Sequence, residues 1–289
     1  MPRSVSAAWP EFPRPHLRHR AGREPRPVPA WLAVAILGII EGITEFLPIS
    51  STGHLLLVEN SHVLPQQSDL FNITIQSGAA LAVLAAFSAR VRDLLLRLGD
   101  PVTRDYLSKL VLAFVITGAG GLIVKKLGFT LPKEVTPIAW ATLIGGIVIL
   151  VIEWALRGKQ LSSEVTWMMA VVVGLAQLLA AVFPGTSRSA ATIMIAMVLG
   201  LSRPAATEFS FLLAVPTLLA AGGFETLHAL RHPGPVPTDW GLLALGTIVS
   251  AITAFLVVRW LIRWVQTHSF TPFGWYRIAL GLAMLMRFV

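Results

Sequence analysis

The sequence predicts an all-α integral membrane protein, a polytopic helical bundle, and three observations support this fold class. First, 55% of the 289 residues are hydrophobic, only 13% are charged, and the mean hydropathy is +0.71. Soluble domains average about 25% charged residues, so lipid must be the solvent for much of this chain. Second, several apolar stretches approach or exceed the roughly 20 residues that a membrane-crossing helix needs. Third, these stretches do not show the short alternating segments of a β-barrel.

The charge and the cysteine content exclude several classes of function. The formal net charge is +8 with a pI near 10.8, and many basic residues lie near span ends or in the N-terminal segment. The positive-inside tendency of membrane proteins explains this distribution, so we expect no nucleic-acid partner. The chain contains no cysteine, which excludes disulfides, thiolate chemistry and cysteine metal ligands.

Residues 1–30 differ from the rest of the chain. They are rich in arginine and proline and contain no apolar run. Proline at this density prevents a helix, and the segment lacks the apolar region of a signal peptide. We expect a disordered basic tail without a catalytic role, followed by a transmembrane domain over residues 31–289.

The first apolar segment is interrupted in a way that predicts a broken helix. Residues 31–47 are apolar apart from one threonine and two glutamates, and Pro48 follows them. The residue before a proline is disfavoured in the α conformation, so the helix should end here. Three hydroxyl residues come next, and residues 54–58 begin a new helix. Such a break at membrane depth is tolerated only where it is buried in protein or lines a wet cavity, which predicts a re-entrant hairpin.

The remaining apolar segments predict about six full crossings in addition to the broken elements. A charged loop over residues 88–109 is expected on the cytoplasmic side because it is rich in arginine and lysine. A polar loop is expected over residues 225–239, and Arg259, Arg263 and Arg277 are expected near span ends. The expected helical segments are residues 70–87, 110–124, 137–156, 165–183, 189–201, 205–224, 240–264 and 273–289.

Two stretches, residues 38–54 and 182–192, resemble each other and predict an internal repeat. At a single offset of 136 residues, the aligned pairs are Gly38 with Gly174, Glu41 with Gln177, Pro48 with Pro184, and Ser51 with Ser187. The chemistry differs, because Glu45 aligns with Ala181 and Thr52 aligns with Arg188. Membrane proteins built from inverted repeats place broken helices and a shared binding site at the repeat interface. We therefore predict two inverted-topology repeats, over about residues 31–130 and 131–289.

The first stretch carries two carboxylates and a cluster of hydroxyls. Glu41 and Glu45 are four residues apart and therefore lie on one helix face. A charged side chain at the centre of a membrane helix costs about 2.5–3.5 kcal/mol, so a metal ion, a cationic partner or a shared proton must offset this pair. Ser50, Ser51 and Thr52 open the next helix, whose free N–H groups and partial positive charge suit a phosphate.

A histidine and an arginine complete the predicted chemistry. His54 lies within one turn of the new helix N-terminus and could act as acid, base or nucleophile on a phosphoryl group. Arg188, in the second stretch, offers a planar fork of donors that fits phosphate oxygens. The predicted phosphate-binding residues around them are Ser50, Thr52, Thr186, Ser187, Ser189 and Thr192. Carboxylates, a cationic clamp and two helix N-termini are the groups that phosphoryl transfer uses.

These motifs carry a family resemblance. GIIEGITEFLPISSTGH, residues 38–54, closely resembles the first signature of undecaprenyl-diphosphate phosphatases, the bacitracin-resistance family, and PGTSRSAAT, residues 184–192, matches the second, PGxSRSxxT. Residues 206–216 and 270–278 also resemble the family, so the resemblance covers about residues 31–289. It implies a multi-pass enzyme of the bacterial inner membrane with re-entrant helix pairs, often a homodimer. The implied reaction hydrolyses undecaprenyl diphosphate to undecaprenyl phosphate and inorganic phosphate, which recycles the lipid carrier of peptidoglycan synthesis and confers bacitracin resistance.

The resemblance also implies roles for single residues. The family's catalytic residues carry over to Glu41, Glu45, Ser51, His54 and Arg188. The two glutamates would bind Mg²⁺ or Ca²⁺, or one of them would act as base, and Arg188 would hold the diphosphate. The attacking group stays open between Ser51, His54 and water. The long N-terminal tail departs from the family pattern. The alternative hypothesis is a transporter or flippase for a polyprenyl phosphate, because transporters also place helix N-termini at an anion.

Overall fold

The structure, a computed structural model, describes residues 28–60, 64–128, 134–234 and 237–288, and every regular element in these ranges is a helix. This confirms the predicted all-α fold class. The prediction for the N-terminal tail falls almost entirely on residues 1–27, which lie outside the described residues. The helices are α1 (Ala30–Thr44), α2 (Ser51–Asn60), α3 (Asp69–Ala86), α4 (Ser88–Leu96), α5 (Pro101–Lys126), α6 (Val135–Ala155), α7 (Trp167–Val182), α8 (Arg188–Val198), α9 (Arg203–Arg231), α10 (Trp240–Thr267) and α11 (Thr271–Phe288).

Five of the described helices are long and apolar enough to cross a membrane: α3, α5, α6, α9 and α10. The helices α1, α7 and α8 are apolar but shorter. Large apolar side chains cover the outside of the bundle, and Trp154 and Leu122 are 74% and 63% exposed. Such apolar surfaces are stable in contact with lipid and not with water, so the chain is a multi-pass membrane protein.

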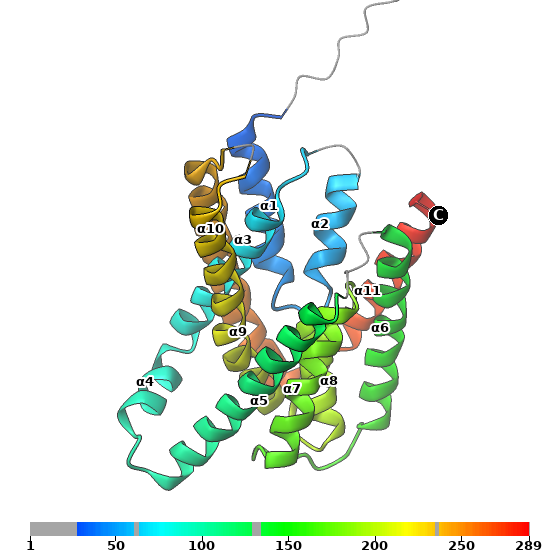
Figure 1. The fold of residues 1–289 in the computed structure, drawn as a ribbon. Helices are drawn as coiled ribbons and strands as arrows, with labels where there is room; N and C mark the ends of the chain where they lie inside the picture. Colours follow the sequence, from blue (N-terminus) through cyan, green and yellow to red (C-terminus); the bar gives the residue numbers. More distant parts are fainter. Residues whose placement is uncertain (1–27, 61–63, 129–133, 235–236, 289) are drawn as a thin grey trace, which may run out of the picture.

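Two helical hairpins enter the bundle from opposite ends and meet near its centre (Figure 1). The pair α1–α2 comes from one end and the pair α7–α8 from the other. Each hairpin turns at a proline followed by a serine with positive φ, Ser50 at 74° and Ser187 at 69°. The hydroxyl of each serine then accepts a hydrogen bond from the backbone N–H three residues on, Gly53 and Ala190. An N-cap of this kind starts a new helix inside the protein.

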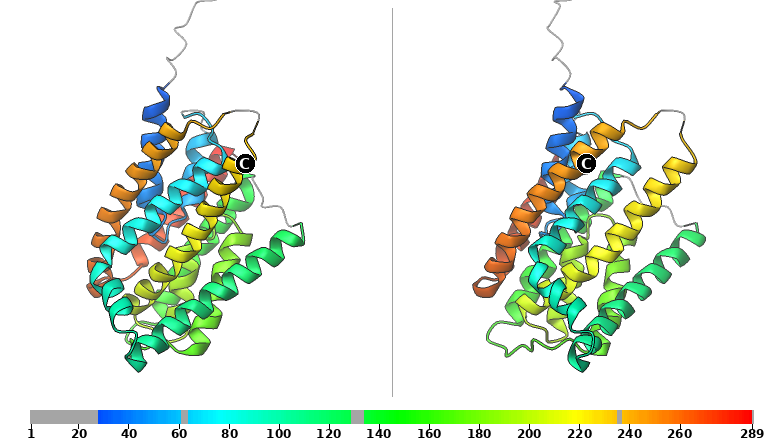
Figure 2. Two further views of the ribbon diagram at one scale, coloured as in Figure 1. Left: turned by 60° about the vertical axis from the view of Figure 1, so that its left-hand side comes forward. Right: turned by 90° about the vertical axis from the view of Figure 1, so that its left-hand side faces the viewer.

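The packing around the two hairpins is similar. Helix α1 packs along α10, and α7 packs along α5, while α3 contacts α9 and α6 contacts α11 (Figure 2). Glycine permits the close approach of α1 to α10, because a Cβ at Gly42 would lie 2.6 Å from the carbonyl oxygen of Ser250. A Cβ at Gly174 would likewise lie 2.8 Å from the carbonyl oxygen of Ala113 in α5. The division into two sequence repeats stays a prediction, and this paired packing supports it.

The expectation of loops over residues 88–109 and 225–239 was wrong in part. Residues 88–96 form α4, and α5 begins at Pro101 with the carboxylate of Asp100 accepting the Thr103 backbone N–H. The charged segment contains a short amphipathic helix that buries Leu94 and exposes Arg92. Helix α9 likewise continues to Arg231, seven residues beyond the expected end.

Candidate active site

The two hairpin tips border a cavity of about 210 Å³ near the centre of the bundle. Its polar wall comes from both tips and from the neighbouring helices α3, α5, α7 and α9. The residues that line it are Glu45, Ser50, Ser51, Thr52, Gln76, Thr117, Gln177, Ala180, Ala181, Gly185, Ser187, Arg188, Thr217 and Leu218. The structure therefore brings together residues that are far apart in the sequence and that the two motifs predicted to share one site.

One hydrogen-bonded network joins the two hairpins across this cavity. Arg188 donates through Nη2 and Nε to Oε1 of Glu45, at 3.0 and 3.3 Å. The other carboxylate oxygen, Oε2, accepts the hydroxyl proton of Ser51 at 2.6 Å. Glu45 and Arg188 are both largely buried, with side chains 7% and 13% exposed. A carboxylate that holds both a hydroxyl and a guanidinium can orient the hydroxyl and accept its proton.

Glu41 lies one turn before Glu45 and is fully buried. Its backbone carbonyl accepts the Glu45 N–H at 2.9 Å, so the two carboxyl groups project from one helix face. Neither carboxylate oxygen of Glu41 has a hydrogen-bond partner among the described residues. Burial of an ionised carboxylate without hydrogen-bond partners is unfavourable in free energy. Glu41 therefore requires either a proton or a bound cation.

His54 points away from the cavity. Its Nδ1 lies 2.7 Å from the carbonyl oxygen of Ser50, an acceptor, so Nδ1 carries the proton in this arrangement. Its Nε2 lies 2.7 Å from the hydroxyl of Tyr276 in α11, which then donates to it. Both ring nitrogens are therefore engaged, one by the tip of the first hairpin and one by α11. His54 does not line the cavity that contains Ser51.

The hydroxyls of the second motif divide into two groups. Ser187 lines the cavity, and its hydroxyl caps α8. Ser189 is buried and donates to the carbonyl oxygen of Leu47 at 2.9 Å, which ties the second tip to the first. Thr192 is buried and donates to the carbonyl oxygen of Arg188 at 2.9 Å, and Thr186 does not line the cavity. Of the four predicted phosphate-binding hydroxyls in this motif, only Ser187 faces the cavity.

A second arginine holds the two tips from behind. Arg277 was expected near a span end; it lies in the first half of α11 and is completely buried. Its guanidinium donates to five backbone carbonyl oxygens at 2.9 to 3.4 Å. The acceptors are Pro48, Ala141, Thr142, Gly185 and Thr186, which belong to both hairpin turns and to α6. No carboxylate of the described chain pairs with it, so the turns themselves satisfy its donors.

Comparison with known proteins identifies the family. The family model described as bacitracin resistance protein BacA matches residues 34–283. The chain belongs to this family. It is 52% identical to an undecaprenyl-diphosphatase of Rhizobium etli (strain CIAT 652) over 256 residues, which cover 88% of this chain and 96% of that protein. It is 49% identical to an undecaprenyl-diphosphatase of Xylella fastidiosa (strain 9a5c) over 251 residues, 86% of this chain and 95% of that protein.

The cavity of this BacA-family protein also contains four polar side chains that sequence reasoning did not place in the site, namely Gln76, Thr117, Gln177 and Thr217. The carboxamide of Gln177 is 3% exposed, and its Oε1 accepts a weak hydrogen bond from Thr117 at 3.4 Å. Its Nε2 has no partner among the described residues, although Gln177 lines the cavity. The repeat offset aligned Gln177 with Glu41, and this was the signal that pointed to it. Gln76 and Thr217 line the same cavity without belonging to either motif.

The acidic pair of this BacA-family site fits a hard divalent cation. The described residues contain no cluster of three or more His, Asp or Glu side chains that could form an all-protein metal site. Glu41 and Glu45 instead supply two carboxylates, one of them with both oxygens free of hydrogen bonds. Mg²⁺ commonly binds through one or two carboxylates and completes its shell with water and substrate phosphates. Two carboxylates are a donor set that such a cation could share with a phosphate, although Glu41 itself does not line the cavity.

Proposed function

We propose that this BacA-family protein is an undecaprenyl-diphosphate phosphatase that releases inorganic phosphate and undecaprenyl phosphate. Relatives with this name match almost the whole described chain at about 50% identity. The reaction recycles the lipid carrier of peptidoglycan synthesis and accounts for bacitracin resistance, after which the family is named. The observation that carries the proposal is the network Ser51–Glu45–Arg188, which faces a cavity between two helix N-termini.

The diphosphate is bound by groups that converge on this cavity. Arg188 presents a planar fork to the phosphate oxygens and shares it with Glu45. The N-termini of α2 and α8 both open at the cavity, where their partial positive charge favours an anion. The hydroxyl of Thr52 and the free Nε2 of Gln177 are additional donors in its wall. The buried setting strengthens each of these interactions.

Ser51 is the attacking group in this proposal. Its hydroxyl lies 2.6 Å from Oε2 of Glu45, which accepts the proton as the oxygen attacks the terminal phosphorus. The bond between that phosphorus and the bridging oxygen breaks, and undecaprenyl phosphate leaves with the bridging oxygen and takes the proton from Glu45, which restores the carboxylate. Water then attacks the phosphoserine, Glu45 accepts a proton from this water, and inorganic phosphate leaves as Ser51 regains its proton. Ser51 is favoured over His54 because His54 lies outside the cavity.

His54 and Tyr276 position the nucleophile in this scheme. The protonated Nδ1 of His54 holds the carbonyl oxygen of Ser50, the residue directly before Ser51. Tyr276 fixes the opposite ring nitrogen. The pair therefore sets the orientation of the strained turn from which the Ser51 hydroxyl points to Glu45.

Glu41 and Glu45 would hold Mg²⁺ or Ca²⁺ when the substrate is bound. A bound divalent cation would neutralise the negative charge on the phosphate oxygens. The protein contributes a buried carboxylate pair whose repulsion and desolvation such a cation relieves.

The setting of this enzyme is the bacterial inner membrane, in which the polyprenyl chain of the substrate lies along the lipid-facing surface. We also propose a homodimer, in line with the large apolar side chains exposed on the bundle. Both statements extend the multi-pass membrane topology that the five apolar helices support.

Phosphate release from a polyprenyl diphosphate by the purified protein in lipid tests the proposal. We expect Ser51→Ala and Arg188→Lys to lower kcat, the first by about 10³-fold or more and the second by about 10²-fold through loss of the fork. Ser88→Ala, an exposed serine at the start of α4, is the matched control and should keep wild-type activity. Detection of phosphate on Ser51 by mass spectrometry during turnover would support the covalent step.

Two outcomes contradict the proposal in different ways. Full activity of Ser51→Ala would exclude the serine nucleophile and leave water as the attacking group. No phosphate release from folded wild-type protein that binds the substrate would favour the transporter hypothesis.

A further inference from the structure

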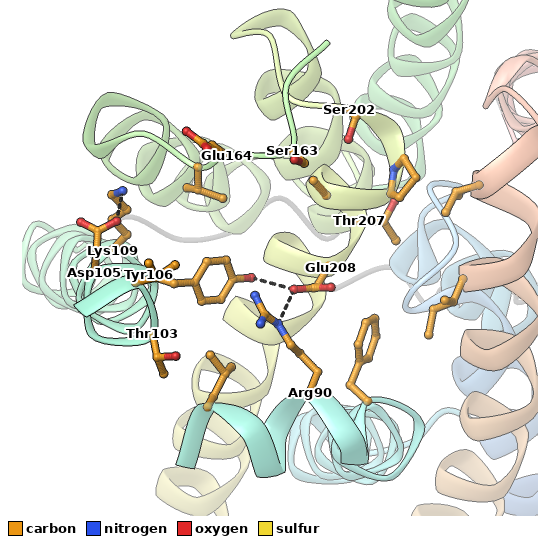
Figure 3. A pocket seen from close by; sticks show the side chains of 18 of the residues that line it. Arg90, Thr103, Asp105, Tyr106, Lys109, Ser163, Glu164, Ser202, Thr207 and Glu208 are labelled. Carbon is orange, nitrogen blue, oxygen red and sulfur yellow. Dashed lines mark hydrogen bonds and ion pairs between the residues drawn. The ribbon is translucent and has the colours of Figure 1, made fainter. Parts of the chain in front are cut away.

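A second and larger cavity lies at the end of the molecule that carries α4 (Figure 1), and Figure 3 shows it from close by. Its volume is about 750 Å³, within the range of sites that bind small molecules. Its walls come from α4, the start of α5, the segment before α7, the start of α9 and the end of α10. None of its lining residues belongs to the catalytic cavity, so it is a separate site.

The floor of this cavity is a polar cluster built from three helices. Arg90 of α4 donates through Nε to Oε1 of Glu208 in α9 at 2.8 Å. The hydroxyl of Tyr106 in α5 reaches the same oxygen at 3.4 Å, and the Arg90 guanidinium lies 4.8 Å from the centre of the Tyr106 ring. The Arg90 and Glu208 side chains remain 40% and 32% exposed, so the pair is open to a ligand. Figure 3 shows both side chains pointing into the cavity.

The charges around this cluster suit a ligand that carries both signs. The cavity is lined by two cations, Arg90 and Lys109, and three carboxylates, Asp105, Glu164 and Glu208. Lys109 pairs with Asp105 and Arg90 pairs with Glu208. The carboxylate of Glu164 has no partner among the described residues, and the Nη atoms of Arg90 donate to no carboxylate or carbonyl of this part of the chain. An anion at Arg90 and a cation at Glu164 would satisfy both.

The surroundings place this cavity at the level of lipid headgroups. Side chains beside it are apolar yet strongly exposed, and Leu96 and Val102 are 76% and 75% exposed. Arg92 lies on the short helix α4, Arg97 directly follows it, and both are also exposed. Apolar and basic side chains on one short helix are typical of a membrane interface. The cavity therefore opens where a phospholipid headgroup is the most abundant ligand.

We propose that this cavity binds a zwitterionic phospholipid headgroup of the phosphoethanolamine type. Its phosphate accepts hydrogen bonds from the Nη atoms of Arg90, and its ammonium donates to Glu164 and to the free Oε2 of Glu208. A headgroup with only a negative charge would meet three carboxylates and two cations, which disfavours it. A purely cationic ligand would leave the Arg90 fork without an acceptor. This inference does not depend on the proposed catalytic function.

Lipid retention tests this proposal. The full-length protein is purified from bilayers of equimolar phosphatidylethanolamine, phosphatidylglycerol and phosphatidylcholine, and the lipids that stay bound are counted by native mass spectrometry. We expect one phosphatidylethanolamine to be retained in preference to the other two lipids, by roughly tenfold. Glu164→Gln should reduce this preference, and it leaves every described ion pair intact, so it does not endanger folding. Arg90→Lys should reduce the retention of all three lipids, since each has a phosphate.

Arg97→Gln is the matched control, because Arg97 is an exposed arginine near the end of the same helix that does not line the cavity. It should retain phosphatidylethanolamine as the wild type does. Equal or stronger retention of phosphatidylglycerol by the wild type would overturn the proposal and point to attraction by the basic surface alone. Equal retention of phosphatidylcholine would also overturn it, because a choline group cannot donate hydrogen bonds to the carboxylates.

Discussion

Replacing Arg277 by lysine tests the claim that this arginine joins the two hairpin turns. The guanidinium donates five hydrogen bonds to carbonyl oxygens of both turns and of α6. The side chain is completely buried, so water cannot replace a lost partner. Lysine keeps the positive charge but replaces the planar fork with three donors on a single nitrogen. At least two of the five hydrogen bonds from this side chain are then lost.

The size of the effect follows from this count. Hydrogen bonds to charged groups contribute about 1.5–3 kcal/mol each, so the loss of two reduces the free energy of unfolding by about 3–6 kcal/mol. Interhelical hydrogen bonds in membranes average only about 0.6 kcal/mol, which sets a lower limit near 1 kcal/mol. Total stabilities of proteins are about 5–15 kcal/mol, so Arg277→Lys should be clearly destabilised. The activity should fall as well, because the turns carry Ser51 and Arg188.

Equilibrium unfolding of the purified protein in detergent measures this effect, with phosphate release as a second readout. Arg263→Lys is the matched control, since Arg263 is exposed in α10 and the sequence placed both arginines near span ends. We expect the control to unfold like the wild type. A free energy of unfolding for Arg277→Lys within about 0.5 kcal/mol of the control, the usual range of surface substitutions, would refute the reasoning.

Three further predictions follow from particular contacts. Gly42→Ala should destabilise the protein by about 1–3 kcal/mol in the same unfolding assay, because its Cβ would press on the α10 backbone. The control is Gly121→Ala in α5, whose Cβ meets no atom within 4 Å and should not lower the stability. Chelation of divalent cations should abolish phosphate release, and added Mg²⁺ or Ca²⁺ should restore it. Glu41→Gln should require at least about tenfold more cation for the same activity. Activity that a chelator leaves unchanged would contradict the proposal that Glu41 and Glu45 hold a cation. Tyr276→Phe should lower kcat by several-fold. It should change the free energy of unfolding by no more than about 1.5 kcal/mol, the contribution of one hydrogen bond. Wild-type kinetics of this variant would exclude a positioning role for the contact between Tyr276 and His54.

The sequence predicted the fold class and the meeting of the two motifs because both depend on local signals. Proline after an apolar helix and hydroxyls after the proline predict a break and a new N-cap, and Pro48 and Pro184 lie at the breaks. A buried carboxylate and a buried arginine each require a partner, and Glu45 and Arg188 satisfy each other. Charge pairing across the membrane interior could therefore be inferred without knowledge of the path of the chain.

The role of Arg277 could not be predicted, because it depends on contacts between distant helices and not on a local signal. An arginine in the first half of an apolar span looks like a residue near the membrane surface. Its burial depends on the close packing of α11 against α6, where a Cβ at Gly146 would lie 2.7 Å from the Gly274 carbonyl oxygen. This approach brings Arg277 behind both turns, and no local pattern reports it. The outward direction of His54 escaped prediction similarly, because its partner Tyr276 lies 222 residues away.

The hydroxyls of the second motif show the limit of reasoning from residue type. Serine and threonine can bind a phosphate, cap a helix or donate to a carbonyl oxygen of the preceding turn, and the sequence does not distinguish these uses. Ser187 caps α8 at the cavity, Ser189 ties one tip to the other, and Thr192 donates to the carbonyl oxygen of Arg188. The predicted phosphate-binding role of Ser189 and Thr192 stays a prediction that the observed contacts do not favour.

The structure also refines how the two hairpins correspond. Gly38 and Gly174 are 136 residues apart, but the two positive-φ serines, Ser50 and Ser187, are 137 apart. The second turn therefore contains one additional residue, and Gly185, with φ of 93°, lies within it. In this frame Ser51 and Arg188 are equivalent, because each is the first residue of its re-entrant helix.

This equivalence explains how a duplicated scaffold makes an asymmetric site. The first helical position of each hairpin points into the same cavity, so a hydroxyl from one hairpin and a guanidinium from the other reach the two oxygens of one carboxylate, Glu45. The second hairpin has Ala181 or Val182 where the first has Glu45, which leaves a single carboxylate between the two groups. A second carboxylate there would compete for Arg188 and add a buried charge without a partner. The asymmetry of the two motifs is therefore what allows one serine to be oriented for attack and one arginine to remain available for phosphate.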